Sequence, residues 1–320
     1  MHTKAEIQSF LSDNGWEQAK AHYLAADFSS RRFLRLTRET GAPATCILMA
    51  SQKDQKTEEF VQIAALLRRL GLASPEIYAS DVVRGLVLME DFGDAPVGKM
   101  LDAGAVRDVY DTYAVDVLAK LHQGFQQAML GALKSPFYNA ALLTDQATLF
   151  LDYYFPSVFH RPATARERSG FVEAWHGVLS PLDALPRSLV LRDFMPDNTM
   201  ELPSPILGQP VGLLDFQDAG IGCIAYDLAS WCEEVRREDG LSRLEAVVTA
   251  YHAKNPAVPL PDLLAAARVY AAQRHTRILG LLVKLERDAM IPRVWKTLQL
   301  LLKEEALAPV RRWFLACRPS

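Results

Sequence analysis

The stretch LRDFMPDN at residues 191–198 decides how the rest of this chain is interpreted. It continues a short apolar run, SLVLRDF at 188–194, and a second run, VGLLDF at 211–216, ends on another carboxylate. Both runs have the length and the apolar content of short strands, so we interpret them as two arms of one hairpin. The loop of this hairpin is where polar side chains gather, and it indicates a site.

Three polar residues of the hairpin have the chemistry of phosphoryl transfer. Asp193 and Asn198 lie five residues apart, in a loop that Pro196 fixes, and Asp215 ends the second arm. Carboxylate and amide oxygens are ligands that Mg²⁺ prefers, and Mg²⁺ also takes phosphate oxygens. We therefore assign Asn198 and Asp215 to the metal and Asp193 to the proton of an attacking hydroxyl. Each carboxylate taken singly could be a loop residue or a strand cap, but the three in this order indicate a catalytic site.

Up to residue 93 the sequence alternates short β-type runs with turns. The runs are AHYLAA, RRFLRLTR, TCILMA at 45–50 and GLVLME at 85–90. Their length and spacing predict a small antiparallel sheet with tight connections. One helix interrupts the sheet within 57–72, because apolar residues recur there at helical spacing and Gly71 stops the pattern.

After residue 93 the sequence becomes helical. Apolar residues recur at helical spacing over 106–124 and 261–285, and a last helical stretch covers 295–317. The sequence therefore predicts an α+β protein of two unequal lobes. A small β-rich lobe comprises residues 1–93, with an extended connector at its end, and a larger helical lobe of residues 94–320 contains the hairpin.

The composition is that of an ordinary globular protein. The 320 residues are 50% hydrophobic, and 35 Lys plus Arg oppose 38 Asp plus Glu, for a net charge of -3. This excludes a disordered chain, a disulfide scaffold and a polycationic nucleic-acid binder. Four cysteines stand far apart, and no signal peptide or membrane span is evident. We expect a cytoplasmic monomer with reduced thiols, which binds small molecules rather than nucleic acid or membrane.

A further motif, GCIAYDLA at 222–229, completes a family signature. The order D-x-x-x-x-N, D-F and G-x-x-x-x-D-L-A resembles that of aminoglycoside-phosphotransferase-like kinases, the small-molecule relatives of protein kinases. The resemblance implies a two-lobed, protein-kinase-like fold and the cofactors ATP and Mg²⁺. It makes Asp193 the catalytic base, gives the metal to Asn198 and Asp215, and has Asp227 support the catalytic loop.

Three positions depart from the pattern of that family. Leu191 stands where the family usually has histidine, Met49 stands where a strand lysine would contact the nucleotide phosphates, and the turn at 26–31 has no glycine. We expect another cation to replace the lysine. Arg31 or Arg32 are the candidates, because a guanidinium can bind phosphate oxygens in a fork; an ordinary charged surface is the alternative for either.

The connector LVLMEDFGD at 86–94 resembles the hinge of the family between its two lobes. In that family the adenine binds main-chain groups of the hinge, which here lie near Glu90 and Phe92. A plain strand followed by a turn is the alternative.

Several segments narrow the resemblance to a subgroup. The runs at 24–35, 47–50, 87–94 and 213–222 look like those of bacterial kinases that phosphorylate the anomeric hydroxyl of N-acetylmuramate and N-acetylglucosamine in cell-wall recycling. That subgroup also has methionine in the corresponding strand, so Met49 supports the resemblance. The expected function is an ATP-dependent 1-kinase of these amino sugars. The alternatives are a kinase of another hydroxyl compound, such as an aminoglycoside or a choline-like molecule, and an inactive nucleotide-binding regulator.

Candidates for sugar contacts are less specific. The segment 160–187 contains several basic residues, and one of them could meet the lactyl carboxylate of N-acetylmuramate. Trp175 and Trp231 could stack on a sugar ring but are more typical of a core. Glu233 and Glu234 could bind sugar hydroxyls, although the pattern favours a solvated helix face.

Overall fold

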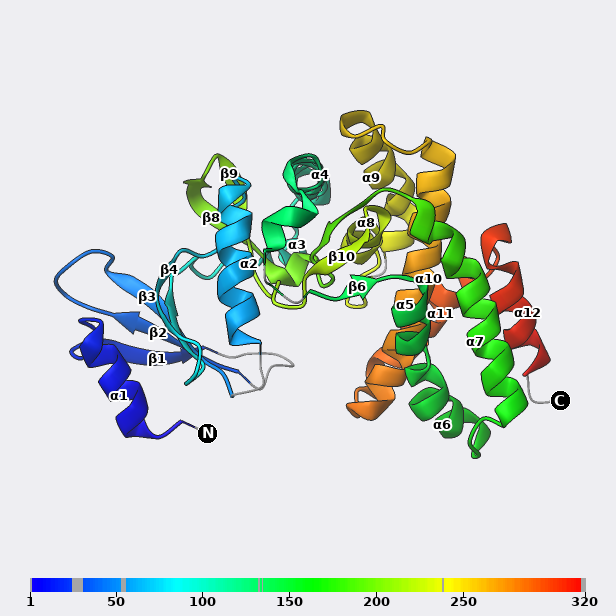
Figure 1. Ribbon diagram of the computed structural model, residues 1–320, viewed down its shortest axis with the longest axis horizontal. Helices are drawn as coiled ribbons and strands as arrows, with labels where there is room; N and C mark the ends of the chain where they lie inside the picture. Colours follow the sequence, from blue (N-terminus) through cyan, green and yellow to red (C-terminus); the bar gives the residue numbers. More distant parts are fainter. Residues whose placement is uncertain are drawn as a thin grey trace. The chain divides into compact units, whose positions relative to one another are not determined.

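The computed structural model describes residues 2–24, 31–52, 56–131, 133, 135–237 and 239–317. These residues form two compact units, which are described separately (Figure 1). The first unit comprises Met1–Arg107, Ala128–Lys134 and Pro196–Ala219. The second unit comprises Asp108–Gln127, Ser135–Met195 and Gly220–Ser320. The sequence analysis placed the boundary between the two lobes of a kinase-like fold at residue 93, and this boundary stays a prediction.

The first unit is built on a five-stranded sheet with the order β1-β2-β3-β5-β4. Its strands are β1 (Lys20–Leu24), β2 (Arg32–Thr37), β3 (Thr45–Ala50), β4 (Ile77–Asp81) and β5 (Leu86–Met89). Every neighbouring pair is antiparallel, which confirms the sheet that the sequence predicts. β4 was not among the predicted runs, because its sequence IYASD alternates only weakly between apolar and polar residues.

Alternate residues of each strand point to opposite faces of the sheet, and helices pack against the sheet. On one face Leu34, Leu36 and Leu48 are buried with Phe10 and Leu11 of α1 (Lys4–Asp13). The other residues of β3 and β5 are also buried, apart from the half-buried Thr45, and α2 (Thr57–Arg69) packs beside β4. α2 coincides with the predicted helix, and the unit also contains α3 (Val97–Asp102).

The predicted hairpin is wrong in its pairing, although its two apolar runs are both strands. β9 (Gln209–Leu213) pairs with β8 (Thr199–Ile206) in the first unit. The run at 188–194 instead supplies β7 (Arg187–Val190), which pairs with β10 (Gly220–Cys223) in the second unit. β8 escapes sequence analysis because its two prolines weaken any strand pattern, and the register of the pair shifts at that point.

The β8–β9 hairpin is attached to the rest of the first unit by backbone hydrogen bonds. The Glu201 N–H donates to the Ala95 carbonyl oxygen at 2.8 Å, and the Leu213 N–H donates to that of Ala73 at 2.7 Å. The turn Leu207-Gly208 has positive φ at both residues, +52° and +76°, as the tightest hairpin turns require. The hairpin therefore belongs structurally with the N-terminal sheet.

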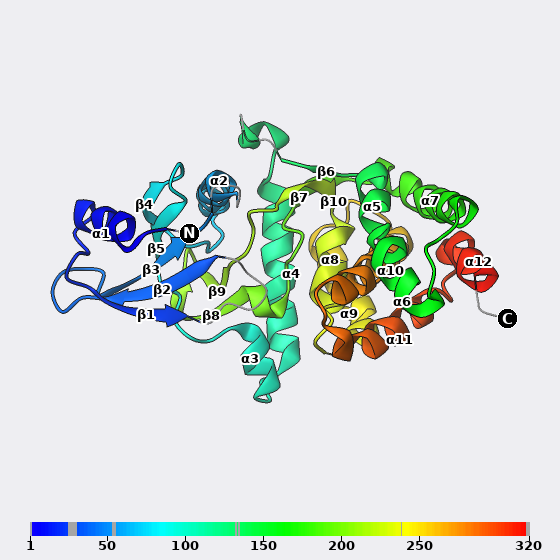
Figure 2. The same cartoon turned by 90° about the horizontal axis from the view of Figure 1, so that it is seen from below.

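The second unit is mainly helical, and α10 (Leu260–Lys284) is its centre (Figure 2). α10 contacts several helices of the unit: α5 (Ala140–Ala147), α7 (Ala165–Leu179), α8 (Ala225–Cys232), α9 (Gly240–Lys254) and α11 (Ile291–Leu301). The unit also contains α4 (Arg107–Gly124), the π-helical turn η2 (Phe150–Tyr154), α6 (Phe155–Phe159) and α12 (Ala308–Ala316). Its sheet has the order β6-β10-β7, in which β6 is Phe137–Tyr138.

The C-terminal stretch corrects one further expectation. The sequence predicts helix throughout 295–317, but α11 ends at Leu301 and α12 starts at Ala308. Pro309 stands in the first turn of α12, where proline is well tolerated but would break a continuous helix. Otherwise the expected α+β class is confirmed, with a β-rich N-terminal part and a helical C-terminal part.

Among the residues that the structure describes, no helix combines the length and the apolar character needed to cross a membrane. The four cysteines form no disulfide among the described residues, and three of them, Cys46, Cys223 and Cys232, are buried. Burial raises the pKa of the Cys46 thiol to about 12, so this thiol stays protonated at neutral pH.

Candidate active site

The backbone just before Asp193 is held by α8. After β7 the chain turns at Arg192, whose φ is +73°, a conformation that a side chain other than glycine adopts only when its surroundings enforce it. Two consecutive amides, those of Leu191 and Arg192, donate to the carboxylate of Asp227 at 2.6 and 3.0 Å. The Arg192 carbonyl oxygen accepts from Ser230 Oγ at 3.0 Å. Asp193 therefore projects from a rigid loop.

Asp227 contacts the loop before Asp193, as expected of a residue that supports the catalytic loop. It lies in the first turn of α8 and is fully buried. Burial raises the pKa of its carboxyl group to about 7, while the amides of Leu191 and Arg192 and the charge of Arg274 oppose that rise. The group links the motif at 222–229 to the loop at 191–198.

Three arginines surround the carboxylate of Asp193. Arg192 Nε is 3.9 Å from Asp193 Oδ2, and the Nη2 atoms of Arg274 and Arg277 are each 4.0 Å from Oδ1. Arg274 Nη1 also donates to the Arg192 carbonyl oxygen at 2.7 Å. Arg274 and Arg277 lie one turn apart on α10 and are both buried. The sequence offered a signal for this pair that we did not use, since two arginines interrupt an apolar helical pattern.

Asn198 and Asp215 lie together at the base of the β8–β9 hairpin. Asn198 ends the 3₁₀ turn Pro196–Asn198, directly before β8, and Asp215 follows β9. Asn198 Nδ2 is 3.4 Å from Asp215 Oδ2, and Gln217 Nε2 donates to Asp215 Oδ1 at 2.8 Å. Asp215 has a φ of +58°. The first unit thus brings together the two residues that the sequence assigns to a metal and adds Gln217, which the sequence analysis missed.

The donor set of this pair fits Mg²⁺. A half-buried amide and an exposed carboxylate offer hard oxygen ligands while leaving room for water and phosphate. A half-turn of the Asn198 amide would present its oxygen in place of its nitrogen, and the two atoms are interchangeable by that rotation. In the described residues no three His, Cys, Asp or Glu side chains form a metal cage, so a cation here would share its shell with a ligand or with water.

Two cations of the first unit lie near these acidic groups. Asp215, Asp218 and Glu59 raise the pKa of the Arg31 guanidinium, but desolvation is the larger effect and leaves that pKa lowered. Lys56, which precedes α2, forms an ion pair with Asp218. The sequence analysis named Arg31 but missed Lys56.

The comparison with known families decides the identity. The sequence profile of the phosphotransferase enzyme family matches residues 20–268 of this chain. The chain belongs to this family. The resemblance to aminoglycoside-phosphotransferase-like kinases is therefore confirmed, and the chain is an enzyme of the transferase class.

Relatives of this phosphotransferase have names that specify a substrate. The N-acetylmuramate/N-acetylglucosamine kinase of Caulobacter vibrioides is 27% identical, over 97% of this chain and 95% of the relative. The protein of the same name from Pseudomonas putida is also 27% identical, over 88% of this chain and 81% of the relative. A solved aminoglycoside 2'-phosphotransferase-IIIa in its GDP complex has the same fold, with a TM-score of 0.63 and 16% identity over 95% of this chain and 98% of that one.

The expected hinge of the phosphotransferase leaves β5 at Met89. The Glu90 N–H donates to the Glu76 carbonyl oxygen at 2.8 Å, so a ligand at this residue would use the carbonyl oxygen. The Glu90 side chain accepts from Arg68 Nη1 at 3.2 Å. The Phe92 side chain is buried against the β8–β9 hairpin, in a cluster with Ala73, Met200 and Leu202.

Arg35 fixes the segment that follows Phe92. Its Nε is 2.7 Å from Asp91 Oδ2, and its Nη2 donates to the Gly93 carbonyl oxygen at 2.9 Å. No role for Arg35 was predicted from the sequence. Arg32 lies on β2 opposite Ala50 and shares its alternation with Leu34 and Leu36, which face α1. Arg32 therefore lies on the sheet face of the α1 cluster, whereas Arg31 interacts with Asp215.

The residues weighed for sugar contacts have other partners. Trp175 and Trp231 are fully buried, as expected for core residues, and Trp231 Nε1 donates to Asp111 at 2.8 Å. Glu233 and Glu234 are not on a solvated helix face. They are buried at the end of α8, where Glu233 meets His275 at 3.0 Å and Glu234 meets Arg237 at 3.0 Å, because α9 and α10 cover that end.

Three of the basic residues in 160–187 also have partners within the second unit. Arg161 forms a fork with Glu167, Arg168 pairs with Asp152, and Arg187 donates to the Asp183 carbonyl oxygen at 2.6 Å. These arginines are therefore weaker candidates for a substrate carboxylate than the cluster around Asp193.

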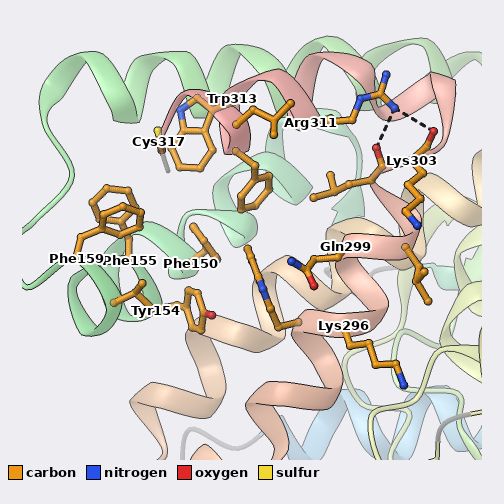
Figure 3. A pocket seen from close by; sticks show the side chains of 16 residues that line it. Phe150, Tyr154, Phe155, Phe159, Lys296, Gln299, Lys303, Arg311, Trp313 and Cys317 are labelled. Carbon is orange, nitrogen blue, oxygen red and sulfur yellow. Dashed lines mark hydrogen bonds between the residues drawn. The ribbon is translucent and has the colours of Figure 1, made fainter. Parts of the chain in front are cut away.

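A separate hollow of about 590 Å³ lies among α6, α11 and α12 (Figure 3). Its walls are mainly aromatic, and Phe150, Tyr154 and Trp313 lie along one side of it, with the ring of Phe150 in contact with the other two. Lys296 and Lys303 lie on its other side. It contains none of the residues that the family signature assigns.

Proposed function

We propose that this phosphotransferase is an ATP-dependent sugar kinase that phosphorylates the anomeric C1 hydroxyl of N-acetylmuramate, N-acetylglucosamine or both, in peptidoglycan recycling. The observation that carries the proposal is the convergence of Asn198 and Asp215 on the β8–β9 hairpin, in the motif order typical of the family. Two relatives that align over most of this chain are named as kinases of these sugars. The substrate comes from those names and from the resemblance of the sequence.

In this proposal Asp193 orients the C1 hydroxyl and accepts its proton as the oxygen attacks the γ-phosphorus of ATP. The rigid peptide of Arg192 holds Asp193 in one position, which favours reaction because a fixed base needs no reorganisation. Asn198 and Asp215 would hold Mg²⁺, which when bound offsets the negative charge of the nucleotide phosphates. Gln217 holds the Asp215 carboxylate from the side opposite Asn198.

The nucleotide would meet two parts of the first unit. Adenine would bind the main chain near Glu90 and Phe92, where the Glu90 N–H is already committed to Glu76. A phosphate would meet Arg31, which lies near the metal residue Asp215, and Lys56 is a second cation in reach of the same acidic cluster through Asp218. Arg32 is a weaker candidate because it shares the face of Leu34. The cytoplasmic location and the monomeric state stay predictions from the sequence.

A substrate screen tests the proposal directly. ATP consumption with Mg²⁺ is measured with N-acetylmuramate, N-acetylglucosamine, kanamycin and choline, and the product is examined by phosphorus NMR. We expect turnover with one or both amino sugars and a phosphorus signal of an anomeric phosphate. A phosphate ester at another carbon, or turnover with kanamycin or choline alone, would contradict the proposed substrate. Binding of Mg²⁺-ATP with no phosphorylated product would favour the inactive regulator.

The role of Asp193 has its own test. Asp193→Asn removes the proton acceptor and should lower kcat by about 10²- to 10⁴-fold, the usual contribution of a positioned general base. Its thermal unfolding midpoint should stay close to that of the wild type. Asp145→Asn, at an exposed position of α5, is the matched control and should leave kcat unchanged. Normal turnover by Asp193→Asn would overturn the mechanism.

A further inference from the structure

Arg277 is a buried cation whose charge is poorly satisfied within the protein. It is 7% exposed on α10, and the nearest carboxylate oxygen, Asp193 Oδ1, is 4.0 Å away, beyond hydrogen-bond distance. Its Nε atom is buried without a hydrogen-bond partner in the described part of the chain. A buried guanidinium without hydrogen bonds is energetically unfavourable. A protein usually keeps such an unfavourable buried cation where a ligand supplies the missing hydrogen-bond partner.

Neighbouring charges make the need for an anion greater. Arg192 and Arg274 approach the same aspartate at 3.9 and 4.0 Å, so three guanidinium groups share the carboxylate of Asp193. The other carboxylate nearby, Asp227, uses both oxygens to accept the amides of Leu191 and Arg192. Burial is the largest effect on the pKa of Arg277 and lowers it; Tyr226 and Asp193 oppose this shift, and the charges of Arg192 and Arg274 act in the same direction as burial.

Arg274 and Arg277 differ in their contacts although they lie one turn apart. Arg274 Nη1 donates to the Arg192 carbonyl oxygen at 2.7 Å and to the Tyr226 hydroxyl oxygen at 3.3 Å. It is therefore a positioning residue for the loop before Asp193. Arg277 makes no hydrogen bond to any residue in the described ranges, so its donors are the ones that a ligand could use.

We propose that Arg277 binds the carboxylate of an acidic sugar substrate and thereby makes the enzyme prefer N-acetylmuramate to N-acetylglucosamine. This inference rests on the proposed function. Asp193 marks the position of the acceptor hydroxyl, so a cation 4.0 Å from its carboxylate is within reach of other groups of the same sugar. N-acetylmuramate carries a lactyl carboxylate on O3, which N-acetylglucosamine lacks, and a guanidinium matches a carboxylate in a two-pronged fork.

The phosphates of ATP are a less suitable partner for Arg277. Their charge is already offset in the proposed function by Mg²⁺ at Asn198 and Asp215 and by Arg31, all of the first unit. Three basic residues first considered for the sugar carboxylate, the arginines at 161, 168 and 187, are engaged elsewhere in the second unit, whereas Arg277 lies beside Asp193.

The test compares two sugars with two variants. We expect Arg277→Met to raise the KM for N-acetylmuramate about 10- to 100-fold, the loss typical of a hydrogen bond between charged groups. The KM for N-acetylglucosamine should change less than about threefold. Arg277→Lys keeps the charge but not the fork and should fall between the wild type and Arg277→Met. The methyl ester of N-acetylmuramate, which retains the lactyl group without its charge, should bind the wild type as weakly as N-acetylmuramate binds Arg277→Met.

Thermal unfolding shows that the variants fold. Removing a poorly satisfied buried charge should leave the unfolding midpoint of Arg277→Met unchanged or raise it. A rise in KM of the same size for both sugars, or no rise for either, would overturn the inference while leaving the proposed function intact. Wild-type turnover with N-acetylglucosamine alone would also overturn it. Wild-type inactivity with both sugars would overturn the proposed function itself, and this inference with it.

Discussion

The backbone nitrogen of Leu191 lies 2.6 Å from a carboxylate oxygen of Asp227, thirty-six residues further along the chain. The second oxygen of that carboxylate accepts from the next amide, that of Arg192. One buried group thus fixes the two peptides that precede the proposed catalytic base. Because this carboxylate is fully buried, its ionisation and the rigidity of the loop are linked.

The first prediction concerns the pH dependence of stability at Asp227. Its pKa is about 7 in the folded protein, against an ordinary value of 3.8, so the folded state holds a proton that the unfolded state releases between these values. The free energy of unfolding contributed by this group is therefore fully present below about pH 4 and is lost as the pH rises to about 7. Asp227→Asn cannot titrate. Urea unfolding is measured at pH 5, 6, 7 and 8. The difference in the free energy of unfolding between the wild type and Asp227→Asn should narrow as the pH rises.

The size of that gap has a second cause that does not depend on pH. An asparagine has one acceptor oxygen and would turn its NH₂ group toward the other amide, which leaves a buried donor unsatisfied and costs about 1–3 kcal/mol. A gap that stays constant from pH 5 to pH 8 would show instead that the Asp227 carboxyl is ionised throughout this range.

The second prediction concerns Gln217, which donates to Asp215 Oδ1 at 2.8 Å. If Asp215 binds the metal, the amide of Gln217 orients it, and losing such an outer partner typically lowers metal affinity about 10- to 100-fold. Gln217→Ala should therefore raise the Mg²⁺ concentration for half-maximal activity within that range, with N-acetylglucosamine as the acceptor. The matched control is Gln62→Ala, at an exposed position of α2. Equal Mg²⁺ dependence of Gln217→Ala and the wild type would show that the contact does not orient a ligand.

The motifs predicted the local features of this fold better than its pairings. The runs at 45–50 and 85–90 became β3 and β5, because uninterrupted apolar stretches bounded by turns have few other solutions. The partner of β9 was missed because Pro203 and Pro205 conceal β8. The sequence of a strand indicates which of its faces is apolar but not which strand it pairs with. Here β7 pairs with β10 and not with β9.

The candidate site was predicted only as far as short-range motifs reach. Asn198 and Asp215 were found because their spacing belongs to a signature, and the structure places their side chains 3.4 Å apart. Arg274 and Arg277 come from a helix more than seventy residues beyond the Asp193 loop. Their approach to Asp193 depends on how α10 packs on α8, which no local pattern encodes. The signal for Arg274 and Arg277 in the sequence was the presence of two arginines in an otherwise apolar helical pattern.

The third prediction concerns the contact that anchors the loop after Asp215. Phe216 is buried, and its ring stacks on Phe60 of α2 with centroids 4.9 Å apart and an interplanar angle of 10°. Such pairs contribute about 0.5–1.5 kcal/mol beyond the area that they bury. A double-mutant cycle of Phe60→Leu and Phe216→Leu, read by urea unfolding, should give a coupling energy in that range. Additive losses would show that the two rings are stabilised by burial alone.

The last prediction compares two helical glycines that have opposite surroundings. A Cβ atom at Gly280 of α10 would lie 2.1 Å from the carbonyl oxygen of Leu149, so the backbone next to η2 must move to admit it. A Cβ atom at Gly177 of α7 would meet nothing within 4 Å, and that position is exposed. Replacing an exposed helical glycine with alanine gains up to about 1 kcal/mol of helix propensity.

Gly177→Ala should therefore stabilise the protein by about 0.5–1 kcal/mol in urea unfolding. Gly280→Ala should destabilise it by about 1–3 kcal/mol or more, since the overlap is with backbone atoms and exceeds the same gain in propensity. The two variants share one chemical change, so their opposite signs isolate the close approach of α10 to Leu149. A stabilised Gly280→Ala would show that α10 can move away from η2 at little cost. The position of Arg274 and Arg277 on that helix would then also be adjustable rather than fixed.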